Sequence, residues 1–106
     1  MTEFLKNVQN PEILRLPIED IIDTSGYSHA QFLRLFKQIS NQTFINYVTQ
    51  LRISHAKLLL SNSPNYSIED VAIKVGYENT SYFVQCFKKY TGYTPKNYQK
   101  LMLKKE

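Results

Sequence analysis

Residues 68–90, IEDVAIKVGYENTSYFVQCFKKY, decide the fold, because nearly the same residues stand earlier in the chain at 18–39, IEDIIDTSGYSHAQFLRLFKQI. The acidic start and the Gly-Tyr pair recur after 50 residues, and the phenylalanines that follow recur after 51. A repeated supersecondary unit usually gives a molecule two copies of one surface. The sequence therefore predicts a duplicated unit, and the next question is what its surface binds.

The size and charge of the chain limit the answer. A chain of 106 residues is long enough for one domain with a small core. The net charge is +4 and the sequence pI about 9.2, and residues 79–105 contain six lysines and no acid. Acidic pairs stand instead at the expected helix starts, at Glu19 and Asp20 and again at Glu69 and Asp70. This distribution favours a polyanionic partner, with nucleic acid ahead of a membrane surface.

Cysteine usage and hydropathy indicate the compartment. The lone cysteine, Cys86, rules out an internal disulfide framework and fits a reducing interior. No basic head followed by an apolar run opens the chain, and no stretch approaches the roughly 20 apolar residues of a membrane helix. We expect a cytoplasmic protein with no membrane partner.

The pattern of residues favours helices throughout. There are three glycines and four prolines, and no strict two-residue alternation of any length. We therefore expect an all-α fold and a single domain over residues 1–106. The segments expected to be helical are 2–10, about 18–25, 28–39, 43–61, 67–75, 80–90 and 95–104. Pro11 is expected to close the opening helix or to bend the chain.

Each repeat reads as a helix, a tight glycine turn and a second helix, which is the layout of a helix-turn-helix. The first unit covers about 17–39 and the second about 67–90, with Gly26 and Gly76 in the left-handed region at the turns. Ser28 with Gln31 and Ser67 with Asp70 read as capping pairs. The connecting helix at 43–61 would be roughly 28 Å long. Its expected buried side consists of Phe44, Tyr47, Val48, Leu51, Leu58 and Leu59.

The second helix of each unit divides into an inner and an outer side at helical spacing. The inner sets are Phe32, Leu35, Phe36 and Ile39 in the first unit and Phe83, Cys86, Phe87 and Tyr90 in the second. The outer sets are Ala30, Leu33, Arg34 and Lys37, and then Ser81, Val84, Gln85 and Lys88. Neither outer set contains an acid, and a helix fits the major groove of DNA.

Individual outer residues have the chemistry of DNA contacts. Arg34 is the best candidate for direct base readout, and Gln85 is its counterpart in the second unit. The amide of Gln85 either pairs with adenine or makes a looser contact of the phosphate type. Leu33 and Val84 either meet a thymine methyl group or pack on neighbouring side chains, and Ala30 is small for a base-reading position. The residues near the helix starts, which would reach base edges or phosphate, are His29, Gln31, Thr80 and Ser81. The residues expected to hold backbone phosphates are Lys37, Lys88 and Lys89.

Several phrases together resemble the DNA-binding domain of the AraC/XylS family of bacterial transcription regulators. They are Ser28 through Phe36-Lys37, Tyr47 with Leu51-Arg52 and Ala56, Ile68 through Val71-Ala72, Val75-Gly76-Tyr77, Ser81-Tyr82-Phe83 through Phe87-Lys88-Lys89, and Gly92-Tyr93-Thr94-Pro95. The resemblance runs from about Pro17 to Tyr98. Two departures from the family pattern are Gln85, where arginine is common, and Asn41-Gln42, where the second unit has Gly92.

The resemblance implies seven helices in a monomeric domain that places two recognition helices into successive major-groove segments of double-stranded DNA. It also implies control of transcription initiation, usually activation through contact with RNA polymerase. In such regulators an effector pocket lies in a separate domain, often N-terminal.

Other classes of function fit the sequence less well. A helical protein-protein interaction module would stack repeats at periods near 34 or 40, whereas here a long connecting helix separates two units. An enzyme is disfavoured, because no Gly-rich phosphate loop, ligand cluster or nucleophile with a nearby base is present, and we expect no catalytic residues and no cofactor. Two histidines and one cysteine give no zinc spacing. Arg52 either pins the two units together or contacts phosphate, and we favour the structural role.

Overall fold

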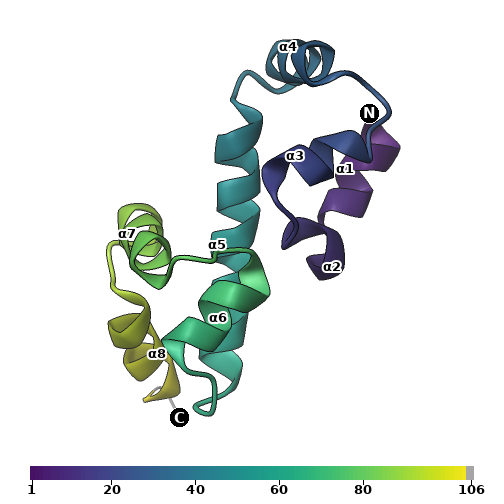
Figure 1. Cartoon of the computed structure of the whole chain (residues 1–106). Coiled ribbons are helices and arrows are strands. Elements are labelled where there is room, and N and C mark those ends of the chain that lie inside the picture. Colours follow the sequence, from purple (N-terminus) through teal and green to yellow (C-terminus); the bar gives the residue numbers. More distant parts are fainter. Residues whose placement is uncertain (105–106) are drawn as a thin grey trace.

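The computed structural model describes residues 1–104 and is all-helical over that range (Figure 1). The helices are α1 (Thr2–Val8), α2 (Pro11–Leu14), α3 (Ile18–Asp23), α4 (His29–Ser40), α5 (Phe44–Asn62), α6 (Ile68–Val75), α7 (Thr80–Thr91) and α8 (Pro95–Leu103). The two repeats form α3 with α4 and α6 with α7, and α5 connects them. The all-α prediction and the two helix-turn-helix units are confirmed.

Eight helices are found within the described residues, where seven were expected. The additional helix is α2, because Pro11 does not merely close α1. Asn10 accepts a hydrogen bond at its side chain from the backbone N–H of Glu12 at 3.0 Å, and Pro11 takes the first helical position. Proline suits that position because its missing N–H would have no partner there. A single turn of helix therefore follows α1 immediately.

Local capping explains why most other helices begin where the sequence predicts. Ser28 and Gln31 exchange side-chain and backbone hydrogen bonds at the start of α4, and Ser67 and Asp70 do so at the start of α6. Both capping boxes are thus confirmed. At the end of α4, Asn41 adopts a left-handed conformation with φ of 63°, which asparagine tolerates better than most residues. Asn41 therefore takes the place that Gly92 holds after α7.

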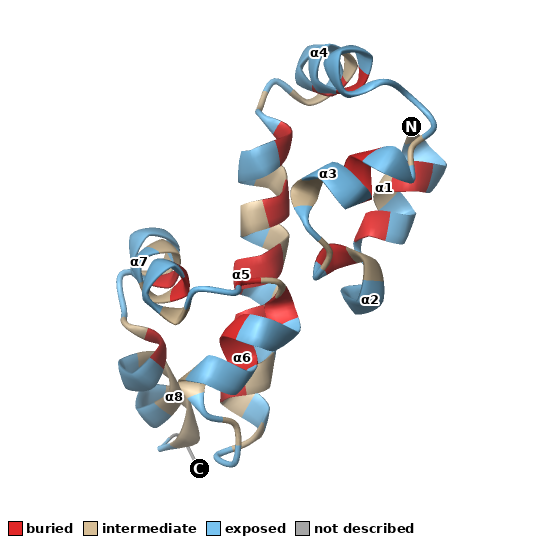
Figure 2. Ribbon diagram, in the orientation of Figure 1, coloured by how far each residue is buried: buried red, intermediate tan, exposed pale blue. Residues whose placement is uncertain are grey.

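Two separate apolar cores lie along α5. Phe44 and Val48 join the first core with side chains from α1–α4, and Ile53, Ala56 and Leu60 join the second with side chains from α6 and α7. At 100° per residue these two sets lie on roughly opposite sides of the helix. Figures 1 and 2 accordingly show α1–α3 on one side of α5 and α7 with α8 on the other.

This change of face explains one wrong prediction. Leu58 continues the side of α5 that carries Phe44 and Leu51, so the spacing placed it in the core, but it is 61% exposed. The first unit no longer covers α5 at that point. Arg52, Ile53, Ala56 and Leu60 are buried instead.

Two further predictions of burial are wrong, and they fail in the same way. Ile39 in α4 is 59% exposed and Tyr90 in α7 is 38% exposed, although both keep helical spacing with the buried phenylalanines. Each stands in the last turn of its helix, which extends past the elements that cover the earlier turns. Leu35 and Cys86 are half-buried.

Candidate nucleic-acid interface

The two helices with acid-free outer sides lie at different places along α5, since α4 lies at its N-terminal end and α7 lies beside its middle (Figure 1). Both are seen nearly end-on in Figure 1, so their axes run roughly parallel. The molecule is elongated, with extents of 45 × 25 × 23 Å. A duplex that met both helices would therefore lie along the long dimension of the molecule.

Packing fixes the orientation of each helix. Phe32 and Phe36 of α4 are buried, and their rings lie 4.7 and 5.2 Å, between centroids, from the ring of Phe44 at the start of α5. In α7, Phe83 and Phe87 are buried in the second core. Because the phenylalanines turn inward, the opposite side of each helix faces outward, as Figure 2 shows.

The structure leaves the candidate DNA-contacting residues accessible. Those that are exposed are His29, Ala30, Gln31, Leu33, Arg34, Lys37, Ser81, Gln85, Lys88 and Lys89. Thr80 and Val84 are half-buried. None of the twelve is buried, so each can contribute at least an edge to a contact surface. Leu33 is 47% exposed.

One candidate already has a partner within the chain. The Nε2 atom of His29 lies 3.0 Å from Oδ1 of Asp23, and Asp23 is the last residue of α3. Both side chains are largely exposed, so solvent screens the contact and its strength is small. His29 must leave Asp23, or share it, to meet a phosphate or a base.

The distribution of acids sets the electrostatics of the surface. Residues 24–68 contain no Asp or Glu, and neither do residues 79–104. Helices α4, α5, α7 and α8 therefore carry no carboxylate side chain, and the acids of the described helices belong to α1, α2, α3 and α6. Lys37, Lys88 and Lys89 have no competing acid on their own helices.

Arg52 is buried, which the sequence alone did not decide. Its Nε donates to the carbonyl of Leu14 at 2.9 Å, and its Nη2 donates to the carbonyl of Leu16 at 2.6 Å. Its Cζ lies 5.4 Å from the centroid of the Tyr77 ring, a cation-π distance. These contacts within the chain favour the structural one of the two roles left open for Arg52.

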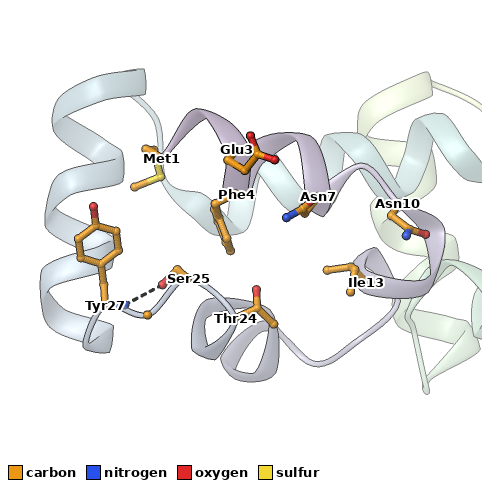
Figure 3. A pocket seen from close by; sticks show the side chains of 10 residues that line it. Met1, Glu3, Phe4, Asn7, Asn10, Ile13, Thr24, Ser25 and Tyr27 are labelled. Carbon is orange, nitrogen blue, oxygen red and sulfur yellow. Dashed lines mark hydrogen bonds between the residues drawn. The ribbon is translucent and has the colours of Figure 1, made fainter.

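A hollow lies away from the outer side of α4, between α1 and the turn after α3 (Figure 3). Its volume is about 580 Å³, and Glu3 and Asn7 of α1 face Thr24 and Tyr27 across it. The lining mixes polar and apolar side chains, with Glu3 as its charged member. Within residues 1–104 no group of three or more His, Cys, Asp or Glu side chains could hold a metal ion. No helix of that range is long and apolar enough to cross a membrane.

Comparison with known proteins identifies the arrangement. A family model described as a helix-turn-helix domain matches residues 16–101. A solved transcriptional regulator of AraC type from Chromobacterium violaceum has a TM-score of 0.79 at 24% identity, over 99% of this chain and 93% of that one. The chain belongs to the AraC/XylS family. It is an AraC-type helix-turn-helix chain, and the family consists of DNA-binding transcription regulators.

Two further similar proteins show how much of a longer regulator this chain covers. The C-terminal domain of the two-component response regulator yesN from Fusobacterium nucleatum has a TM-score of 0.80 at 28% identity, over 92% of this chain and 96% of that domain. The bifunctional transcriptional activator/DNA repair enzyme AdaA of Bacillus subtilis is 37% identical over 82% of this chain. The chain spans only 41% of the length of AdaA.

The structure exposes one residue that the sequence analysis did not include among the candidate DNA-contacting residues. Tyr82 of α7 is 55% exposed beside Gln85, and its ring centroid lies 5.9 Å from that of Tyr77. The signal was present, because Tyr82 follows Ser81 on the acid-free helix. Its aromatic character suggested burial instead.

Proposed function

We propose that this chain binds double-stranded DNA by inserting α4 and α7 into successive major-groove segments on one face of the duplex. The observation that carries the proposal is the pair of matched helices, whose exposed sides lack acids and whose axes run roughly parallel. Successive major-groove segments on one face recur at roughly 34 Å.

The proposed contacts divide into those that read sequence and those that hold the backbone. Arg34 pairs its guanidinium with guanine, and Gln85 pairs its amide with adenine. Lys37, Lys88 and Lys89 neutralise phosphates and supply affinity without sequence information. The remaining members of the surface are His29, Ala30, Gln31, Leu33, Thr80, Ser81 and Val84, which meet base edges, thymine methyl groups or phosphate.

We also propose the regulatory output. AdaA is named a transcriptional activator, and the same output here would use a surface that leaves α4 and α7 free for DNA, with RNA polymerase as the protein contacted. The chain acts as a single domain and as a monomer in this proposal, and it performs no chemistry of its own. The two cores on one continuous helix support the idea that one chain suffices to present both recognition helices.

The test is to select bound duplexes from a random library and footprint the best one. We expect two protected windows on one face, about one helical turn apart. Affinity for random duplex should fall steeply as salt rises, because phosphate contacts release counterions. A flat salt response together with no enriched sequence would contradict the proposal and favour a protein-protein interaction module.

A further inference from the structure

Arg52 is the one charged side chain that is buried within residues 1–104, with 7% of its surface exposed. A buried guanidinium is costly unless its N–H groups find partners. Within the described residues no carboxylate forms an ion pair with it, and the hydrogen bonds go to two backbone carbonyls instead. Burial lowers the pKa of Arg52 and the nearby Tyr77 opposes that shift, but an arginine remains charged at neutral pH. A local ion pair therefore does not explain why a charged residue is buried at position 52.

The partners of Arg52 come from both halves of the chain. Leu14 ends α2 and Leu16 precedes α3, so the two accepting carbonyls belong to the first half of the chain. Tyr77 follows α6 and belongs to the second unit. Arg52 itself lies in the middle of α5. One side chain therefore contacts the first half, the connecting helix and the second unit.

The packing around Gly76 shows how close these three segments come. A Cβ atom at Gly76 would lie 2.8 Å from Cζ and Nε of Arg52 and 3.0 Å from Cα of Arg15. Both distances are shorter than van der Waals contact allows. The turn of the second unit therefore sits against the guanidinium and against the backbone before α3, with no room for a side chain.

Few other contacts join the two halves. The apolar side chains form two clusters that share no buried member. Without the contact at Arg52, the relative orientation of α4 and α7 would depend mainly on α5, and long helices bend gently at low cost. The cluster around Arg52 adds a second connection beside the helix.

We propose that Arg52 is a positioning residue that fixes the spacing and relative orientation of the two recognition helices, without touching DNA. The expected effect on DNA binding rests on the proposed function. The expected effect on the arrangement of α4 and α7 does not depend on DNA binding. Arginine suits the role because its planar group donates from Nε and Nη2 to two carbonyls while stacking on an aromatic ring. Lysine keeps the charge but has a single donor atom.

The first experiment measures spacing preference with Arg52→Lys. The selected duplex is compared with versions carrying one base pair more or fewer between its two halves. For the wild type we expect each change to weaken binding about tenfold or more, comparable to a mismatched base pair. For Arg52→Lys we expect weaker binding to the selected duplex and a spacing penalty that falls toward onefold. An unchanged penalty would overturn the proposal.

The salt dependence of binding separates positioning from phosphate contact. Arg52→Lys and wild type should give the same slope of log affinity against log salt, because residue 52 contacts no DNA phosphate in either protein. A control, Lys37→Ala, should reduce the slope by about one. A reduced slope for Arg52→Met, which removes the charge, would make Arg52 a phosphate contact and overturn the proposal.

The second experiment needs no DNA and keeps the inference separate from the proposed function. Spin labels at Gln38→Cys in α4 and Lys89→Cys in α7, in a Cys86→Ser background, report the distance between the two helices. We expect a narrow distribution with Arg52 and a broader one with Arg52→Lys or Arg52→Met, each checked by circular dichroism for helix content. Equal widths in folded variants would overturn the proposal even if DNA binding is confirmed. A broadened distribution supports it even if no duplex is bound.

Discussion

The two helix-turn-helix units share a plan but differ at the turn. Gly26 and Gly76 occupy equivalent places and both have positive φ, 82° and 108°. A Cβ atom at Gly26 would meet nothing within 4 Å, because the turn borders the hollow beside α1, whereas one at Gly76 would collide with Arg52 and Arg15. Repetition therefore preserves backbone conformation at the turn, but only the second turn packs against the other half of the chain.

The hydrogen bonds that form the two turns also differ. After α6, the N–H of Tyr77 donates to the carbonyl of Ala72 at 2.8 Å, and Gly76 donates to Ile73 at 3.1 Å, which is the Schellman pattern. After α3, the hydroxyl of Ser25 accepts from the N–H of Tyr27 at 3.2 Å. The first turn has backbone bonds too, from the N–H groups of Ser25 and Gly26 to the carbonyls of Ile22 and Asp23 at 2.9 and 3.5 Å. The first turn therefore adds local side-chain bonds to its backbone bonds, and the second adds a packed neighbour.

The largest expected effect is on stability at the second turn. Gly76→Ala should lower the free energy of unfolding by about 3 kcal/mol or more, since a left-handed alanine costs about 1–2 kcal/mol and overpacking adds about 1–3. Gly26→Ala should cost about 1–2 kcal/mol, from the backbone alone. Urea unfolding of both variants measures the difference.

A matched control exists at the end of α7. Gly92 has φ of 83° and, like Gly26, nothing within 4 Å of an added Cβ. Gly92→Ala should therefore resemble Gly26→Ala. Equal losses for all three variants would show that the contact between Gly76 and Arg52 does not constrain the second turn.

The next effect concerns the two proposed base readers. Arg34→Ala should cost about 1–3 kcal/mol of binding at the selected duplex and relax selectivity at one base pair. Gln85→Ala should cost about 1 kcal/mol, because an uncharged amide forms weaker hydrogen bonds than a guanidinium. Binding to duplexes substituted one base pair at a time measures both. Equal loss on every sequence would instead identify Arg34 as a phosphate contact.

Helix capping should have a smaller effect, and it again differs between units. Ser28→Ala and Asn79→Ala each remove a side-chain acceptor for a backbone N–H, at about 1 kcal/mol of stability. Gln31→Ala should add a further loss in the first unit, because Gln31 returns a bond to Ser28. Tyr82 stands at the corresponding place in α7 and has no such role. Thermal unfolding of the four single variants tests this, and a Tyr82→Ala loss as large as that of Gln31→Ala would argue against it.

The smallest expected effect is at the tyrosine after each glycine. The Tyr77 hydroxyl is buried and has no hydrogen-bond partner among residues 1–104, so Tyr77→Phe should change stability near neutral pH by less than about 0.5 kcal/mol. Tyr27 is 41% exposed, and Tyr27→Phe should be equally mild. Thermal unfolding at pH 7 measures both, and a large loss in Tyr77→Phe would reveal a missing partner for the hydroxyl.

Tyr77 should also make the stability of the chain depend on pH in the alkaline range. Burial, with a smaller contribution from Cys86, raises the pKa of Tyr77 to about 12. The unfolded chain loses this proton near pH 10, so the stability that Tyr77 contributes is full below pH 10 and is lost as the pH rises toward 12. The stability of Tyr77→Phe should be less sensitive to pH than that of the wild type across that window.

Local rules explain what the sequence predicted well. The turn glycines, the capping pairs and the 19-residue length of α5 follow from conformational preferences of a few neighbouring residues. The proposed contact residues were found to be accessible because the phenylalanines of α4 and α7 fix the opposite side of each helix. Spacing within one helix is enough for that inference.

The remaining features depend on contacts between distant segments. The change of buried face within α5 could not be read from its own spacing, because both halves keep a helical pattern and Leu58 still lies on the same side as Leu51. The partners of Arg52 are 36 and 38 residues away in sequence. Ile39 and Tyr90 are exposed because of where neighbouring helices end, which their own residues do not encode.

The separation of acids from α4, α5, α7 and α8 has a consequence before any contact is made. Most of the lysines lie on the acid-free helices, although Lys6 and Lys74 share α1 and α6 with acids. Such a distribution of charge gives the chain an electric dipole, and the field of a polyphosphate exerts a torque on it. Diffusing toward a duplex, the molecule would turn its lysine-bearing helices forward while it was still within a few Debye lengths of the surface. Fewer encounters would then be wasted on the wrong orientation.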